Sequence, residues 1–92
     1  MSDRAAHWIV SGRVQGVGFR WYTMEAASRL GIAGWVRNRA NGTVEVAAAG
    51  SADAIAELEK AIAKGPSFSL VKRVERHDIS LESIDCNSFE IR

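Results

Sequence analysis

The stretch GRVQGVGFR, from Gly12 to Arg20, holds residue types suited to binding an anion. Gly16 and Gly18 lack a Cβ, so their backbone can adopt left-handed angles and let an oxyanion approach the main chain closely. If a helix begins after these glycines, its first N–H groups have no intrahelical partner and add positive potential. The guanidinium of Arg20 can hold two oxygens of a tetrahedral anion. We therefore expect a phosphate-binding loop made of Gln15, Gly16, Val17, Gly18, Phe19 and Arg20.

Two familiar nucleotide-binding motifs do not match this loop. The P-loop needs Lys followed by Ser or Thr after its glycines, and the dinucleotide fingerprint needs an acidic residue in the following strand. The chain has neither pattern at this place. Isolated glycine motifs also occur by chance. Taken alone, the stretch is therefore better explained by two turn-forming glycines and a solvated Arg20.

Asn38, within GWVRNRANG, is a second candidate because it is expected at the end of a strand. A carboxamide has both a donor and an acceptor, so Asn38 could hold a water molecule by two hydrogen bonds. Asparagine is also common before turns for backbone reasons. For this position by itself, a role in the turn is the stronger interpretation.

Other polar residues give weaker indications of chemistry. His7 and His77 fall in expected strands with no Asp or Cys at a ligand spacing, so we expect surface histidines and no metal site. Ser11 and Cys86 have no activating base nearby in the sequence, which leaves covalent catalysis unsupported. Three tryptophans are expected to pack rather than to form a stacking surface: Trp8, Trp21 and Trp35.

Two segments have apolar residues at helical spacing. The first follows the glycine loop and ends at Gly31, with a face made of Phe19, Tyr22, Ala26 and Leu30. The second follows Ser51, a good N-cap, and ends at Gly65 and Pro66. Its apolar stripe consists of Ile55, Leu58 and Ile62.

Five segments rich in β-branched and aromatic residues indicate strands. They are 7–14, then 33–39 and 43–49 as a hairpin, an irregular strand through Val71, Val74 and Ile79, and a short edge strand over 88–92. In the hairpin turn around Ala40, Asn-Gly is expected to supply two positive φ angles. The order β-α-β-β-α-β is that of an α+β ferredoxin-like fold, with two helices on one face of an antiparallel sheet.

Length and charge limit the classes of function. A chain of 92 residues predicts a single domain over 1–92. With 12 Lys and Arg against 11 Asp and Glu, the net charge of +1 lacks the footprint of a general nucleic-acid binder, so an anion site must be local. One cysteine excludes an intramolecular disulfide and suits a reducing compartment. The N-terminal residues have no apolar run, so we expect no signal peptide, no membrane association and a cytoplasmic location.

Together, the loop and the Asn38 segment resemble the two signatures of the acylphosphatase family. VSGRVQGVGFR, from Val10 to Arg20, is similar to the first signature. GWVRN, from Gly34 to Asn38, is similar to the second together with Gly42, Val44 and Gly50. The resemblance extends over the whole chain, through Gly65-Pro66, Val71, Val74, Phe89 and Ile91.

This resemblance implies hydrolysis of a small acyl phosphate to a carboxylate and inorganic phosphate, without metal, cofactor or phosphoenzyme. It implies that Arg20 and the loop amides bind the phosphoryl group and that Asn38 positions the attacking water. Arg39 follows Asn38 where many relatives have Thr, and the sequence ends at Arg92 where relatives often continue to an aromatic residue. We expect a monomer.

Two other functions are compatible with the same fold. The open sheet face could bind RNA, although TVEVAAA lacks the aromatic residues of RNA-recognition strands. The domain could also be a non-catalytic part of a larger protein that only binds phosphate or carbamoyl phosphate.

Overall fold

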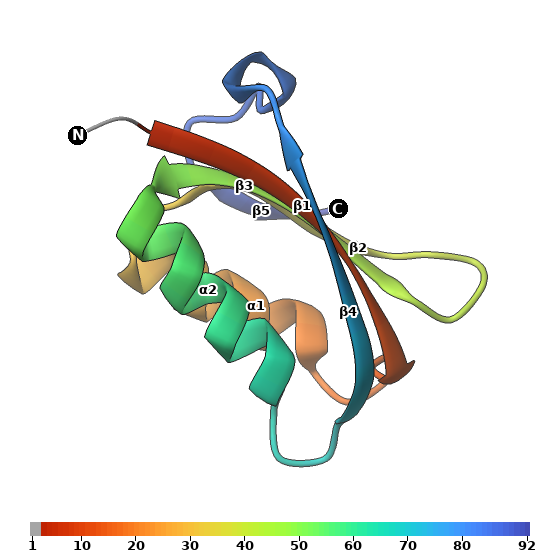
Figure 1. Cartoon of the computed structure of the whole chain (residues 1–92). Helices are drawn as coiled ribbons and strands as arrows, with labels where there is room; N and C mark the ends of the chain where they lie inside the picture. Colours follow the sequence, from red (N-terminus) through yellow and green to blue (C-terminus); the bar gives the residue numbers. More distant parts are fainter. Residues whose placement is uncertain (1–2) are drawn as a thin grey trace.

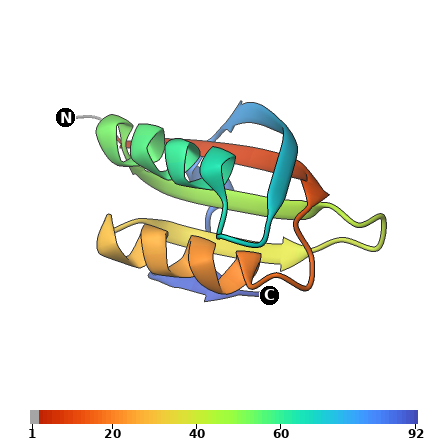
Figure 2. The same ribbon diagram turned by 90° about the horizontal axis from the view of Figure 1, so that it is seen from below.

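The structure, a computed structural model, describes residues 3–92. Five strands form one sheet, and two α-helices lie on one face of it (Figures 1 and 2). The elements are β1 (Asp3–Arg13), α1 (Phe19–Arg29), β2 (Ala33–Asn38), β3 (Val44–Ser51), α2 (Ala52–Lys64), β4 (Leu70–Ile79), a 3-10 turn (Leu81–Ser83) and β5 (Phe89–Ile91). The predicted ferredoxin-like order is confirmed.

The strands lie in the order β4-β1-β3-β2-β5. The four long strands pair antiparallel, as predicted, whereas β5 pairs in parallel with β2. Because β4 runs opposite to β2 and the chain reverses once before β5, the last strand runs in the same direction as β2. The sheet is therefore mixed, which the sequence did not indicate.

The hydrophobic core lies between the sheet and the helices. α1 packs over β2 and β5, and α2 packs over β1, β3 and β4 (Figure 2). In α2 the predicted stripe of Ile55, Leu58 and Ile62 is buried, and the Ser51 hydroxyl oxygen accepts a hydrogen bond from the Ala54 N–H at 3.1 Å. Neither helix among residues 3–92 is long and apolar enough to cross a membrane.

The buried row of α1 differs by one position from the prediction. Phe19 is buried as expected, but Thr23 and Ala27 replace Tyr22 and Ala26 as the next buried residues. Tyr22 instead faces α2, where its hydroxyl donates to the carbonyl of Ala61 at 2.8 Å. The Thr23 hydroxyl donates to the Phe19 carbonyl at 2.9 Å, which satisfies a polar group inside the core.

Two local irregularities were predicted, one correctly. Ser11 pairs with Arg73 and Gly12 with Val71, so Lys72 is an extra residue and β4 carries the expected bulge. In the β2–β3 turn, however, Gly42 has φ 89° and no non-glycine residue in the described chain has a positive φ. The expectation of two positive angles was wrong because the connection is longer than a two-residue turn.

Candidate active site

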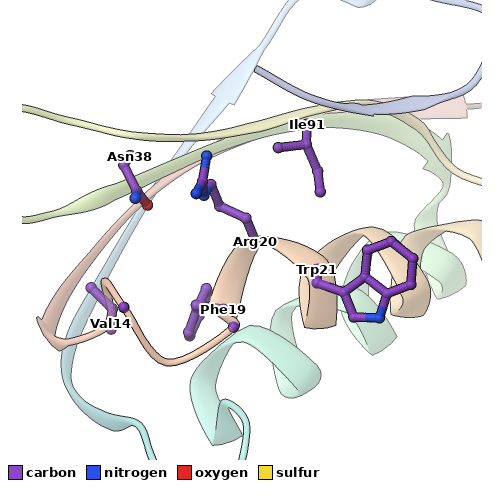
Figure 3. Close-up of a pocket in the computed structure, with 8 residues that line it drawn as sticks. Val14, Phe19, Arg20, Trp21, Asn38 and Ile91 are labelled. Atoms are coloured by element: carbon purple, nitrogen blue, oxygen red, sulfur yellow. The ribbon is translucent and has the colours of Figure 1, made fainter.

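The register of the sheet brings the two candidate motifs together at the end of the sheet where β1 and β2 finish. β1 and β2 are both antiparallel to β3, so they run in the same direction and end at the same edge of the sheet. Val44, at the start of β3, pairs with Val10 of β1 on one side and with Asn38 of β2 on the other. The loop that follows β1 therefore lies next to Asn38 (Figure 3).

The loop between β1 and α1 has the backbone that its glycines predict. Gly16 and Gly18 have φ angles of 74° and 79°, in the left-handed region. Gly18 is the N-cap of α1, and no side chain of residues 3–92 caps this helix end. The first turn of α1 also contains no acidic residue. The end of the helix that attracts anions thus opens onto the loop.

A pocket of about 220 Å³ opens at this place (Figure 3). It is lined by Val14, Gly16, Gly18, Phe19, Arg20, Trp21, Asn38 and Ile91. Arg20 is the only charged residue among them, and its guanidinium lies between Asn38 and Ile91 in Figure 3. Within residues 3–92 no carboxylate forms an ion pair with Arg20.

Asn38 lies at the end of β2 with a buried, unsatisfied acceptor. Its Oδ1 atom has no hydrogen-bond partner among the described residues. The turn uses another asparagine: Asn41 Oδ1 accepts from the N–H and the hydroxyl of Thr43 at 3.2 and 2.7 Å. A buried acceptor without a partner is rare in proteins and is a natural position for an ordered water.

Two residues of the predicted loop lie outside the pocket lining. The Gln15 side chain donates from Nε2 to the carbonyls of Arg39 at 2.7 Å and Thr43 at 2.9 Å, which joins the loop to the β2–β3 hairpin. Val17 packs against the hydrophobic core. These Gln15 contacts could not be predicted from the sequence, because they join residues 24 and 28 positions apart in the chain.

Three lining residues were not among the predicted site residues: Val14, Trp21 and Ile91. Apolar residue types do not by themselves indicate a site. Trp21 is 60% exposed, so the expectation that it packs was wrong, whereas Trp8 is fully buried as expected. Exposure of a large aromatic residue is the signal that could have found it, but exposure is a property of the fold.

The other sequence candidates lie away from the pocket. His7 Nε2 and Glu45 Oε2 are 2.6 Å apart, Arg37 Nε donates to Glu45 Oε1 at 2.6 Å, and His77 is exposed. Burial raises the pKa of Glu45, but its hydrogen bonds with His7 and Arg37 outweigh burial and lower the pKa overall. Across residues 3–92 no three His, Cys, Asp or Glu side chains are grouped to hold a metal ion.

Cys86 is half-buried and free, and its Sγ lies 3.5 Å from the carbonyl oxygen of Gly34. Burial raises the pKa of its thiol, and the charge of Glu90 adds to this. A raised pKa disfavours the nucleophilic thiolate. The half-buried Ser11 lies in β1 at the bulge. Neither residue lines the pocket.

The fold and the pocket together define a small ferredoxin-like domain with an open site at a helix N-terminus. The sequence profile of the acylphosphatase family matches residues 6–91. An acylphosphatase of Koribacter versatilis is 47% identical over 90 residues, with 98% of this chain and 81% of the relative covered. An acylphosphatase of Bifidobacterium longum is 45% identical over 86 residues, with 94% of this chain and 89% of the relative covered.

The fold agrees with the same relationship. The crystal structure of acylphosphatase from Bacillus subtilis superposes with a TM-score of 0.91 at 38% identity, covering 97% of this chain and 98% of that one. The chain belongs to the acylphosphatase family.

Proposed function

We propose that this acylphosphatase hydrolyses the carboxyl-phosphate bond of acyl phosphates with Arg20 and Asn38 as its catalytic residues. Arg20 and the backbone N–H groups of loop 15–20 bind the phosphoryl group, and Asn38 positions the attacking water. The supporting observation is that Arg20, which has no carboxylate partner within residues 3–92, and Asn38, whose buried Oδ1 has no hydrogen-bond partner there, line one pocket at a helix N-terminus.

In the proposed reaction, the water oxygen attacks phosphorus while the bond from phosphorus to the acyl oxygen breaks. The electron pair of that bond leaves with the carboxylate; one proton of the water passes to a phosphate oxygen, and the other stays on the attacking oxygen. Asn38 Oδ1 accepts a hydrogen bond from the water and so directs a lone pair at phosphorus. A carboxylate is a good leaving group, so positioning and charge stabilisation can suffice without a strong base.

We propose that the reaction needs no metal ion, because Arg20 and the positive end of α1 can balance the phosphoryl charge. The test is release of inorganic phosphate from benzoyl phosphate with and without a chelator. Equal rates in both conditions are expected. Activity that disappears with chelator and returns with a divalent cation would contradict this part of the proposal.

The role of Asn38 is tested by Asn38→Ala. Loss of an oriented hydrogen bond that acts in the transition state lowers kcat by about 100-fold or more, with a much smaller change in KM. Asn41→Ala, in the same hairpin and outside the pocket lining, is the matched control and should keep near-normal turnover. Unchanged kcat in Asn38→Ala would remove this assignment.

We also propose a single domain that acts as a monomer in the cytoplasm and binds no nucleic acid. The aromatic residue on the open sheet face, Trp35, already has the guanidinium groups of Arg37 and Arg92 each 5.4 Å from its ring. It is therefore poorly placed to stack on a base. Salt-sensitive binding of single-stranded RNA at physiological ionic strength would support the RNA-binding alternative, and light scattering would measure the oligomeric state.

A further inference from the structure

Two exposed apolar side chains line the pocket on the far side of Arg20 from Asn38 (Figure 3). Trp21, in the first turn of α1, is 60% exposed, and Ile91, in β5, is 39% exposed. Ile91 pairs with Val36, two residues before Asn38, and lies one strand farther toward the sheet edge. The other large apolar lining residues, Val14 and Phe19, are almost fully buried and offer little surface to a ligand.

The geometry of phosphoryl transfer indicates on which side of the pocket the acyl group lies. The attacking and leaving oxygens lie roughly in line on opposite sides of phosphorus. If the water is held at Asn38 and the phosphoryl group at Arg20, the acyl oxygen departs on the side of Trp21 and Ile91. We propose that Trp21 and Ile91 form a subsite for the acyl group, which gives the enzyme a preference for uncharged aromatic or other large apolar acyl groups. This inference rests on the proposed roles of Arg20 and Asn38.

The charge and size of the pocket agree with this substrate class. The single cation in the lining is taken by the phosphoryl group, so a second negative charge on the acyl group finds no partner there. Arg92, the residue after Ile91, lies outside the pocket lining and is already paired with Glu90 at 3.1 Å and Asp85 at 3.4 Å. A pocket of about 220 Å³ has more room than the four atoms of a phosphoryl group need, since one water occupies about 30 Å³ in the liquid.

An indole also suits the acyl group of an aromatic substrate. It offers a flat apolar face on which a ring can stack with an offset, and such pairs contribute beyond simple burial of area. Ile91 adds aliphatic surface above the same opening (Figure 3). A methyl group, as in acetyl phosphate, is too small to contact much of this surface.

The experiment compares kcat/KM for benzoyl phosphate and acetyl phosphate in wild type, Trp21→Ala and Ile91→Ala. Phe68→Ala is the matched control, because Phe68 is 83% exposed and lies outside the pocket lining. The ratio of the two kcat/KM values cancels the intrinsic reactivity of each substrate when variants are compared. We expect the benzoyl-to-acetyl ratio to fall about 3- to 10-fold in Trp21→Ala and less in Ile91→Ala. It should stay at the wild-type value in Phe68→Ala.

Inhibition by inorganic phosphate shows whether a substitution acts on the acyl group or on the phosphoryl site. A fall in the ratio with an unchanged Ki for phosphate assigns the loss to the acyl group rather than to the phosphoryl site. A wild-type ratio in both Trp21→Ala and Ile91→Ala would overturn the subsite while leaving the proposed function intact. A wild-type enzyme that hydrolyses neither substrate would overturn both proposals. Alanine is favourable at an exposed helical position, so Trp21→Ala should fold, and circular dichroism checks this.

Discussion

Arg20 lies in the first turn of α1, and its side chain places the guanidinium beside Asn38 in the pocket (Figure 3). Its charge is unshared with any carboxylate of residues 3–92, so an incoming dianion does not have to displace an ion-pair partner. A guanidinium presents two parallel N–H groups to two oxygens of a phosphoryl group. At this scale, one side chain supplies both charge and orientation.

Arg20→Ala should therefore weaken binding of the phosphoryl group more than any other single change in the loop. We expect the Ki for inorganic phosphate to rise about 10- to 100-fold, the effect of removing a hydrogen-bonded charge. Arg20→Lys should recover only part of this, because an ammonium group lacks the planar two-pronged geometry. Arg29→Ala, at the other end of α1, is the control. An unaltered Ki in Arg20→Ala would exclude Arg20 as the phosphoryl ligand.

At the scale of elements, the loop and the β2–β3 hairpin are joined by one carboxamide. Both Nε2 hydrogens of Gln15 are donated to hairpin carbonyls, those of Arg39 and Thr43. These carbonyls flank the turn that follows Asn38, so Gln15 is placed to hold Asn38, for which we propose a water-positioning role, in register with the proposed phosphate-binding loop. We therefore expect Gln15 to act through Asn38, as a positioning residue.

Gln15→Leu should lower kcat by about 10-fold and leave the Ki for phosphate nearly unchanged, because small misplacements of reacting groups slow turnover strongly. The decisive measurement is a double-mutant cycle. In an Asn38→Ala background, Gln15→Leu should have little further effect on kcat, since the residue it positions is gone. Fully additive losses would show that Gln15 acts independently of Asn38.

The helix start of α1 depends on a glycine for a backbone reason. Among residues 3–92, a Cβ on Gly18 would meet nothing within 4 Å, so space is not the constraint, but its φ of 79° is unfavourable for alanine. Gly18→Ala should cost about 1–2 kcal/mol of stability, whereas Gly18→Asn should cost less because Asn tolerates this conformation. Thermal unfolding of both variants tests this. Equal melting temperatures for wild type and Gly18→Ala would show that the strain is relieved elsewhere.

At the scale of the whole molecule, the sheet separates two kinds of surface. The face toward the helices holds the core and ends in the pocket, whereas the open face carries a hydrogen-bonded network of His7, Arg37 and Glu45. Glu45 is at the centre of this network, and its side chain is only 13% exposed. The network connects β1, β2 and β3 away from the pocket.

The lowered pKa of Glu45 predicts how stability depends on pH. The folded pKa lies below the unfolded one, about 4.3, so the stabilisation is fully present above that pH and is lost as the pH falls toward the folded pKa. Glu45→Gln should reduce the free energy of unfolding at pH 7 by about 1 kcal/mol. The difference from wild type should shrink below about pH 4. Denaturant titrations at pH 7 and pH 3.5 measure the difference in free energy of unfolding between wild type and Glu45→Gln. An equal difference at both pH values would contradict a contribution from the ionised Glu45 carboxylate.

Much of the fold follows from interactions between residues close in the chain. The helical stripe of α2, its Ser51 cap and the left-handed glycines before α1 each depend on a few neighbouring residues, and the structure contains them as predicted. Trp8, which the sequence analysis expects to pack, is likewise fully buried in the core. Such features are local because backbone sterics and periodic burial act over a few positions.

The remaining features depend on contacts between distant parts of the chain. The hydrogen bond from the Tyr22 hydroxyl to the Ala61 carbonyl of α2 joins residues 39 positions apart. Gln15 contacts hairpin residues that are 24 and 28 positions away. The last strand, β5, pairs with β2, which lies much earlier in the sequence. The sequence marked Arg20 and Asn38 as candidates, but their residue types do not reveal that Trp21 and Ile91 border the same opening. Which side chains share a pocket is decided when the sheet and helices pack, because packing alone determines which surfaces are left uncovered.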